Sequence, residues 1–167
     1  MSLELKLQKL SRESFAPFGD VIETNGAEHL IINEGTTERF HDLANIDVWR
    51  EGGKPLINIF RGSPRPQPIE IKMMERHPLG SQTFMPLQNT PYLVVVAPIG
   101  DSVGPEDLQA FEAAGHQGVN YKLDLWHHPL LVLEDGHEFL VIDRDGSGEN
   151  CTEHWFTADQ GIAQIAL

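Results

Sequence analysis

The stretch that decides the fold of this chain is Glu75-Arg-His-Pro-Leu-Gly-Ser-Gln82. It follows an alternating apolar run and carries a carboxylate, an imidazole, a guanidinium and an amide close together. If the strand continues to His77, its period of two places Glu75 and His77 on the face of three preceding apolar residues, Ile69, Ile71 and Met73. Because burial of such groups is costly unless they are paired or used in chemistry, this stretch is the first candidate for a functional site.

Short extended segments on both sides of this stretch indicate an all-β protein. Tyr92-Leu-Val-Val-Val-Ala97 is apolar at every position, which is typical of a central strand with both faces covered. Further strands are expected at residues 3–7, 20–24, 30–32, 38–43, 56–60, 119–123, 126–133, 138–142 and 152–156. About ten short strands without an internal repeat favour a barrel or jelly roll, and we expect one domain over residues 1–167.

Residues 105–114 are the one segment for which the pattern predicts a clear helix. Pro105 suits a first helical position, and Leu108 and Phe111 would share one face. A further short helical turn is expected within residues 11–18.

The composition limits the classes of partner. With a formal charge of −13, the chain lacks the basic surface that nucleic acid or an anionic membrane would need, so we expect a small-molecule substrate or another copy of the chain. The single cysteine, Cys151, excludes an internal disulfide and favours a reducing compartment. No segment approaches the roughly 20 apolar residues of a membrane span, and we expect a cytoplasmic protein.

The spacing Glu75-x-His77-x4-Gln82 resembles the first cupin motif, in which two histidines are followed by a glutamate. Glu75 stands at the first histidine position and Gln82 at the glutamate position. The second cupin motif, a glycine followed three residues later by a histidine, is matched by Gly118-Val-Asn-Tyr121, with Tyr121 in place of the histidine.

These replacements argue against a tight metal cage. Gln82 could bind only through a neutral amide oxygen, and the phenol of Tyr121 ordinarily stays protonated. The sequence therefore requires no cofactor. A weakly bound divalent metal on Glu75 and His77, completed by water or substrate, stays open.

The segment Trp126-His-His-Pro129 opens a later strand. Adjacent strand residues point to opposite sides, so only one of His127 and His128 can share a face with His77. Both sides of this segment are apolar, and the pattern alone does not choose between the two histidines.

Several long strings together resemble the ureidoglycolate lyase family of allantoin degradation. They are Glu38-Arg-Phe-His-Asp-Leu-Ala44, Glu75-Arg-His-Pro-Leu-Gly-Ser-Gln-Thr-Phe-Met-Pro86, Gln117-Gly-Val-Asn-Tyr121, Trp126-His-His-Pro-Leu130 and Ile142-Asp-Arg-Asp-Gly-Ser147. The resemblance implies a cupin-type β-barrel, a homodimer, a bacterial cytoplasmic location and cleavage of ureidoglycolate to glyoxylate and urea. Nickel has been associated with this family, so the resemblance makes nickel the candidate for a weakly bound metal.

Ureidoglycolate is a hemiaminal with a carboxylate, so the implied reaction needs a cation, a base and an acid but no redox cofactor. Arginine suits the carboxylate through its two-pronged geometry, with Arg61 as first choice and Arg39 as second. We expect His77 to act as the base, and Glu75 to orient it or to donate the proton.

The urea half would be bound by neutral donors and acceptors. The candidates are Gln82, Tyr121 and one of His127 and His128. Trp126 is a further candidate substrate contact, although a core position is its simpler interpretation.

Other readings of the same residues stay open. The pair of Glu75 and His77 could be structural, and the arginines could form surface or dimer-interface ion pairs. A metal-dependent cupin enzyme, such as an isomerase or a dioxygenase, is one alternative function. A small-molecule-binding cupin without catalysis is the other.

Overall fold

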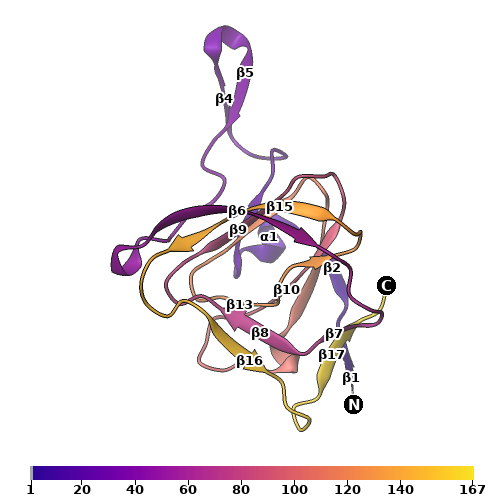
Figure 1. The fold of residues 1–167 in the computed structure, drawn as a ribbon. Helices are drawn as coiled ribbons and strands as arrows, with labels where there is room; N and C mark the ends of the chain where they lie inside the picture. The colour runs from indigo at the N-terminus through magenta and orange to yellow at the C-terminus, as the bar shows by residue number, and fades with distance from the viewer. Residues whose placement is uncertain (1) are drawn as a thin grey trace.

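Strands dominate the computed structural model, which describes residues 2–167 (Figure 1). One short helix, α1 (Arg12–Phe15), and three 3-10 turns at Asn33–Gly35, Arg50–Gly52 and Pro105–Asp107 interrupt them. The strands are β1 (Ser2–Glu4), β2 (Leu7–Lys9), β3 (Gly19–Ile22), β4 (His29–Ile32), β5 (Thr37–Phe40), β6 (Lys54–Gly62), β7 (Ile69–Ile71), β8 (Met73–Arg76), β9 (Gln82–Pro86), β10 (Tyr92–Ala97), β11 (Gln109–Ala113), β12 (Gly118–Tyr121), β13 (Trp126–His127), β14 (Leu131–Val132), β15 (His137–Asp145), β16 (Thr152–Trp155) and β17 (Ile162–Ile165). The expected all-β, cupin-like fold is confirmed. Within residues 2–167 no helix has the length and apolar character needed to cross a membrane.

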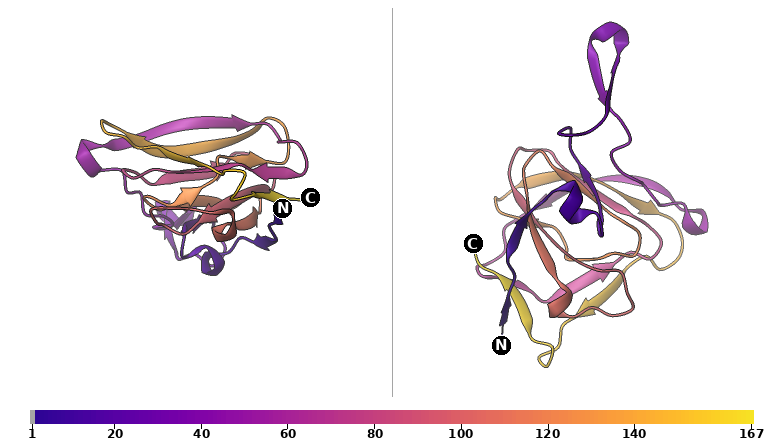
Figure 2. Two further views of the ribbon diagram at one scale, coloured as in Figure 1. Left: turned by 90° about the horizontal axis from the view of Figure 1, so that it is seen from below. Right: turned by 180° about the vertical axis from the view of Figure 1, so that it is seen from behind.

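The strands form three stacked sheets and a separate hairpin (Figure 2). The middle sheet has the order β16-β8-β13-β10-β11-β2, with β14 also paired to β10. On one side lies the sheet β3-β12-β9-β15-β6, and on the other lies the small sheet β1-β17-β7. The candidate stretch therefore begins in the middle sheet, on β8, and ends at the start of β9 in the neighbouring sheet.

Two hydrophobic cores lie on opposite sides of the middle sheet. Val94 and Val96 of β10 pack into a core with the β9, β12 and β15 side chains, which include Phe84. Leu93 and Val95 of the same strand pack into a second core with residues of β7 and β17. The prediction that residues 92–97 form a central strand with two covered faces is confirmed.

The predicted helix at residues 105–114 is wrong. Only Pro105–Asp107 forms a 3-10 turn, and the chain is already extended at Leu108, with φ −75° and ψ 136°. The following residues form β11, which pairs with β10 and β2 and buries Phe111 against Phe15. Sheet pairing and burial on both sides outweigh a helix propensity of a few tenths of a kcal/mol per residue.

The prediction that Glu75 shares a face with Ile69 and Ile71 is wrong. The run does not form one strand, because β7 pairs with β17 whereas β8 pairs with β13 and β16. The phase shifts at this break, so Met74 joins Ile69 and Ile71 in the second core. Glu75, the next residue along β8, therefore points to the opposite side, toward the barrel interior.

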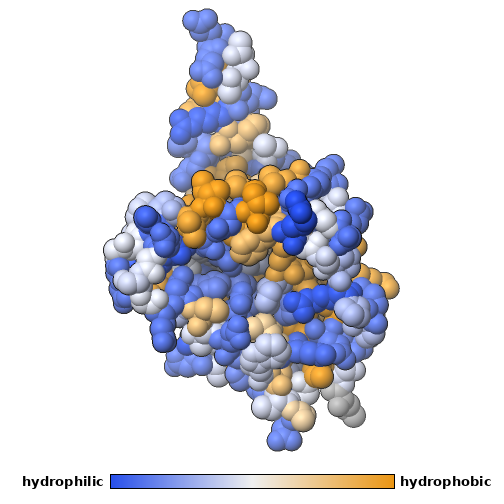
Figure 3. All heavy atoms as spheres, in the orientation of Figure 1, coloured by the Kyte–Doolittle hydropathy of each residue, from blue (hydrophilic) through white to orange (hydrophobic). Residues whose placement is uncertain are grey.

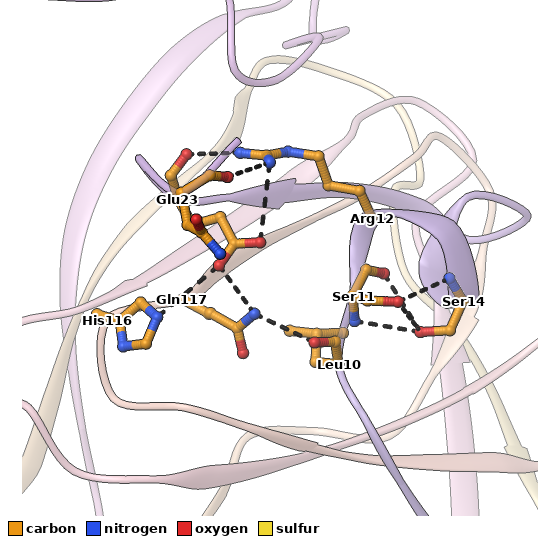
Figure 4. Close-up of polar contacts among 8 residues, drawn as sticks. Leu10, Ser11, Arg12, Ser14, Glu23, His116 and Gln117 are labelled. Carbon is orange, nitrogen blue, oxygen red and sulfur yellow. Dashed lines mark hydrogen bonds and ion pairs between the residues drawn. The ribbon is translucent and has the colours of Figure 1, made fainter. Parts of the chain in front are cut away.

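A buried carboxylate anchors the N-terminal segment to the barrel (Figure 4). Glu23 accepts a hydrogen bond of 3.0 Å from Nε2 of Gln117, which also donates to the carbonyl oxygen of Leu10 at 3.1 Å. Arg12 and His116 place nitrogen atoms 3.9 and 3.8 Å from the Glu23 carboxylate. These contacts hold α1 against the barrel and stand apart from the candidate stretch.

The hairpin of β4 and β5 projects away from the sheets (Figures 1 and 2). Among the described strands, β4 and β5 pair only with each other, and Leu30 and Ile31 are more than half exposed. A two-stranded hairpin is marginally stable by itself in water, so this segment lacks a core of its own in the single chain.

Candidate active site

Three titratable side chains meet on the inner face of the middle sheet. Glu75 of β8 lies directly opposite His127 of β13, which places the two side chains on the same face. Oε1 of Glu75 is 3.9 Å from Nδ1 of His127 and 3.7 Å from Nε2 of His77. The two imidazole rings have centroids 5.1 Å apart. The structure thus brings together the carboxylate and both imidazoles from segments about 50 residues apart in sequence.

His77 is held in a defined orientation. Its Nδ1 lies 2.7 Å from the carbonyl oxygen of Asn150. Because a carbonyl oxygen only accepts hydrogen bonds, Nδ1 carries the proton, and Nε2 of the neutral ring has the free lone pair. That Nε2 atom is buried and has no hydrogen-bond partner within residues 2–167. It faces Glu75 and is available to a substrate proton.

Burial sets the charge state of the neighbouring groups. It raises the pKa of Glu75, an effect that the adjacent His77 partly offsets. It lowers the pKa of His127 to about 3, so this ring is neutral at physiological pH. The rings of Tyr121 and His127 are stacked, with centroids 4.5 Å apart. Burial raises the pKa of the Tyr121 phenol. The cluster therefore combines a carboxyl group with a raised pKa, the neutral imidazole of His127 and a neutral phenol.

A cleft of about 470 Å³ opens beside the cluster. Glu75 and Gln82 lie on its wall, Phe60 and Phe84 supply apolar surface, and Arg65 is one of two arginines that line it. Gln82 also borders an adjoining cavity of about 300 Å³ that includes His77. The volume suits a small polar acid, and the wall combines charged and polar side chains with apolar ones.

The other arginine of this cleft is Arg61. Its Nε and an Nη2 atom donate hydrogen bonds of 3.2 and 3.0 Å to Glu138, and its side chain is 71% exposed. It therefore lies at the rim of the cleft as part of an ion pair. Arg39 lies on β5 of the projecting hairpin, opposite Leu30, and outside the cleft of its own chain.

The alternation argument for the two histidines is confirmed, and the structure makes the choice that the pattern left open. His127 points to His77, whereas Nδ1 of His128 bonds to the carbonyl oxygen of Pro129 at 2.8 Å. Trp126 points to the opposite side of the sheet, into the second core, where the Arg76 guanidinium lies 4.8 Å from its ring centroid. Trp126 is therefore apart from the cleft.

Comparison with known proteins identifies the family of this chain. The family model described as ureidoglycolate lyase matches residues 2–163, which include the candidate stretch and every member of the cluster. The chain belongs to the ureidoglycolate lyase family. A protein named ureidoglycolate lyase from Burkholderia mallei (strain NCTC 10229) is 54% identical over 165 residues, covering 95% of this chain and 96% of that protein. Proteins of the same name from Pseudomonas putida (strain W619) and Pseudomonas syringae pv. syringae (strain B728a) are each 51% identical, over 93% and 94% of this chain and 93% and 92% of their own lengths.

The donor set of this ureidoglycolate lyase family member fits a divalent metal better than the sequence alone indicated. One donor atom each from Glu75, His77 and His127 lie within 4.8 Å of one another. Nε2 of both His77 and His127 is buried without a partner among residues 2–167. Two imidazole nitrogens and one carboxylate oxygen are ligands suited to nickel or zinc. His127 is thus a third candidate metal ligand, in addition to Glu75 and His77, which the sequence spacing had suggested.

Three residues at or near the cluster in this family member were not among the sequence candidates. Asn150 holds His77, and Asp143 lines the adjoining cavity beside Gln82. Asn58 donates a hydrogen bond of 3.0 Å to Asp143. Alternation along β15 could have indicated Asp143, because Phe139 and Val141 on the same face are both buried. No local pattern indicates Asn150, which lies in a loop.

The buried His128 makes the stability of this lyase-family chain depend on pH. Burial lowers its pKa to about 4, with the Pro129 bond opposing and Arg65 reinforcing the shift. The unfolded chain protonates this ring near pH 6.5, so between pH 6.5 and 4 the unfolded state binds more protons and stability falls as pH falls. We expect His128→Gln to reduce the loss of unfolding free energy between pH 7.5 and 4.5 by on the order of 2 kcal/mol. Urea denaturation at both pH values measures the unfolding free energy. If its change between the two pH values is the same in wild type and variant, His128 is not its source.

Proposed function

We propose that this chain is an enzyme that cleaves ureidoglycolate to glyoxylate and urea. Membership of the ureidoglycolate lyase family and the names of its relatives support the substrate. The observation that carries the chemistry is the free Nε2 of His77 beside the carboxyl group of Glu75; Glu75 lines a cleft of suitable size and His77 lines the cavity that adjoins it.

The proposed reaction is a balanced proton transfer and bond cleavage. His77 removes the hydroxyl proton, and the carbon–oxygen double bond of glyoxylate forms as the bond from carbon to the ureido nitrogen breaks. The departing nitrogen takes the bonding electron pair and a proton from Glu75, which releases urea. The proton on His77 then returns to Glu75, whose oxygen is 3.7 Å away.

These roles follow from the two environments. Asn150 already orients His77, so Glu75 is not needed for that purpose and can serve as the acid. Burial raises the pKa of Glu75 and so favours the protonated form that an acid requires. The neutral side chains of Gln82, Tyr121 and His127 would bind the urea half through hydrogen bonds.

The carboxylate of the substrate needs a cation at the mouth of the cleft. Arg61 is our first candidate, and Arg65 is the second arginine on the same wall. A guanidinium that already holds Glu138 at the rim keeps donors free for a second carboxylate, because it carries five N–H groups.

We expect Arg61→Ala to raise KM for ureidoglycolate roughly 10- to 100-fold with a smaller change in kcat, because a charged hydrogen bond in the bound state is lost. Steady-state kinetics measure the two constants. Lys54→Ala is the matched control, since Lys54 forms a similar exposed ion pair with Asp145 at the other end of β6. If Arg65→Ala raises KM and Arg61→Ala does not, the cation is Arg65.

The function itself is tested by a coupled assay that detects both glyoxylate and urea from ureidoglycolate. Equal amounts of the two products are expected. Binding of ureidoglycolate without glyoxylate formation would favour a cupin that binds a small molecule without catalysis, and it would overturn the proposed reaction.

A divalent ion held by Glu75, His77 and His127 is the alternative to the metal-free reaction, because its binding would occupy Nε2 of His77 and the carboxylate of Glu75. Such an ion would act as a Lewis acid on the substrate oxygens when bound. We propose weak binding completed by water or substrate, with nickel as the ion to test first. Elemental analysis of the purified protein, with assays before and after chelation, tests this. A stoichiometric metal whose removal abolishes turnover of a different substrate would favour a metal-dependent isomerase or dioxygenase.

We further propose a homodimer in the bacterial cytoplasm. Apolar side chains gather on the surface over β6, below the projecting hairpin (Figure 3). Ile57 and Ile59 of this edge strand are 68% and 54% exposed, and Leu30 and Ile31 add apolar surface on the hairpin. An exposed apolar patch of this kind is typical of an interface between subunits. Recovery in the cytoplasmic fraction tests the compartment.

We expect Ile59→Lys to shift the molar mass at micromolar concentration toward that of one chain, 18.7 kDa, because a charge would be buried in the interface. Light scattering coupled to size exclusion measures the mass. Leu87→Lys is the control, because Leu87 is similarly exposed outside β6 and the hairpin. A wild-type mass of one chain would contradict the dimer.

A further inference from the structure

Gln82 has a buried acceptor atom that the protein itself does not use. Its side chain is only 6% exposed, and Oε1 has no hydrogen-bond partner within residues 2–167. The residue lies on the wall shared by the cleft with Glu75 and the cavity with His77. A buried amide oxygen is costly to leave unpaired, so this atom points to a ligand that donates a hydrogen bond.

Neighbouring strands determine which way this amide faces. Gln82 and Asp143 line the same cavity, where burial raises the pKa of the Asp143 carboxyl and the Gln82 amide opposes that rise; only Nε2 of this amide can donate to a carboxylate. Asn58 donates a second hydrogen bond to Asp143, from Nδ2 to Oδ1 at 3.0 Å. With Nε2 directed at Asp143, Oε1 is turned away from it.

The order of the strands makes this arrangement part of the sheet. Asn58 is on β6, Asp143 on β15 and Gln82 on β9, and β15 lies between the other two. Val141 pairs with Asn58, so Asp143 is its diagonal neighbour on the same face. Ile142 pairs with Thr83, which places Gln82 next to Asp143 one step further along.

We propose that Asp143 and Asn58 are positioning residues that hold the Gln82 amide so that its oxygen accepts hydrogen bonds from the ureido N–H groups of the substrate. This inference rests on the proposed function. It gives a reason for the amide at the position where the cupin motif has glutamate: a second carboxylate next to Asp143 would repel it, whereas an amide donates to Asp143 and accepts from the ligand. The Gln82 oxygen would then favour substrates with a nitrogen leaving group, because an analogue without N–H groups would leave this buried acceptor unpaired.

Product inhibition separates this role from a structural one. Urea carries the N–H donors and glyoxylate carries none. We expect Asp143→Asn, which can pair with either end of the amide and so releases its orientation, to weaken inhibition by urea about tenfold and to leave inhibition by glyoxylate within about twofold. Gln82→Leu should have the same selective effect, and the double variant should be no worse than Gln82→Leu, because both changes remove one interaction.

Controls make each outcome decisive. Asp145→Asn on the same strand, exposed and paired with Lys54, should leave both inhibition constants unchanged. If Asp143→Asn does not fold, Asn58→Ala takes its place and should weaken urea inhibition selectively by a smaller factor. Equal loss for urea and glyoxylate, or additive effects in the double variant, would overturn the inference while wild-type turnover still supports the lyase. An absence of glyoxylate from the wild type would instead overturn the function itself.

Discussion

Replacing His77 with alanine should lower kcat/KM for ureidoglycolate by roughly 10²- to 10⁴-fold, with the loss mainly in kcat. The reason is that Nε2 of this ring is the free base of the cluster, buried, unpartnered within residues 2–167 and 3.7 Å from Glu75. Asn150 fixes its proton on Nδ1, so no rotation or tautomer change is needed before it takes the hydroxyl proton. The coupled glyoxylate assay measures the loss.

Two control variants test whether the loss is specific to His77. His116→Ala removes an exposed imidazole near Glu23, outside the cleft, and should leave turnover within about twofold. Asn150 contributes a backbone carbonyl, so an Asn150 side-chain variant should alter the rate less than His77→Ala does. Turnover of His77→Ala close to the wild-type rate, in a protein with an unchanged melting temperature, would remove His77 from the mechanism.

Changing Glu75 to glutamine should also lower kcat by roughly 10²- to 10⁴-fold, because the departing ureido nitrogen loses its proton donor. Glutamine keeps the size of the side chain and its contact with the neighbouring imidazoles. The fold should therefore survive. Glu112→Gln is the matched control, since Glu112 is an exposed strand carboxylate on β11, away from the cleft.

An analogue distinguishes an acid from an orienting group. If the leaving nitrogen carries an electron-withdrawing acyl substituent, it needs less help from a proton donor. The defect of Glu75→Gln should then shrink about tenfold or more on this analogue, whereas the defect of His77→Ala should not. A Glu75→Gln defect of the same size on both substrates would mean that Glu75 only orients its neighbours.

Local patterns carried much of the prediction because they depend on side-chain alternation and spacing. The apolar run at residues 92–97 predicted the central strand, and the spacing of Glu75, His77 and Gln82 indicated the cupin site. The same kind of reasoning failed at residues 105–114, where an apparently helical pattern forms a turn and β11. Hydrogen bonds from β10 and β2 decided that segment, and they come from elsewhere in the chain.

The sequence by itself determined that the chain is all-β, that residues 75–82 hold a carboxylate, an imidazole and an amide, and that only one of His127 and His128 could join them. The tertiary structure decided that it is His127, through the pairing of β13 with β8, and that a break after β7 turns Glu75 inward. It also placed Asp143 and Asn58 beside Gln82, on the neighbouring strands β15 and β6. Local spacing fixes which residues alternate within a strand, but the order and register of strands depend on contacts between distant segments. These contacts placed the acid, the base and the amide around the cleft and its adjoining cavity.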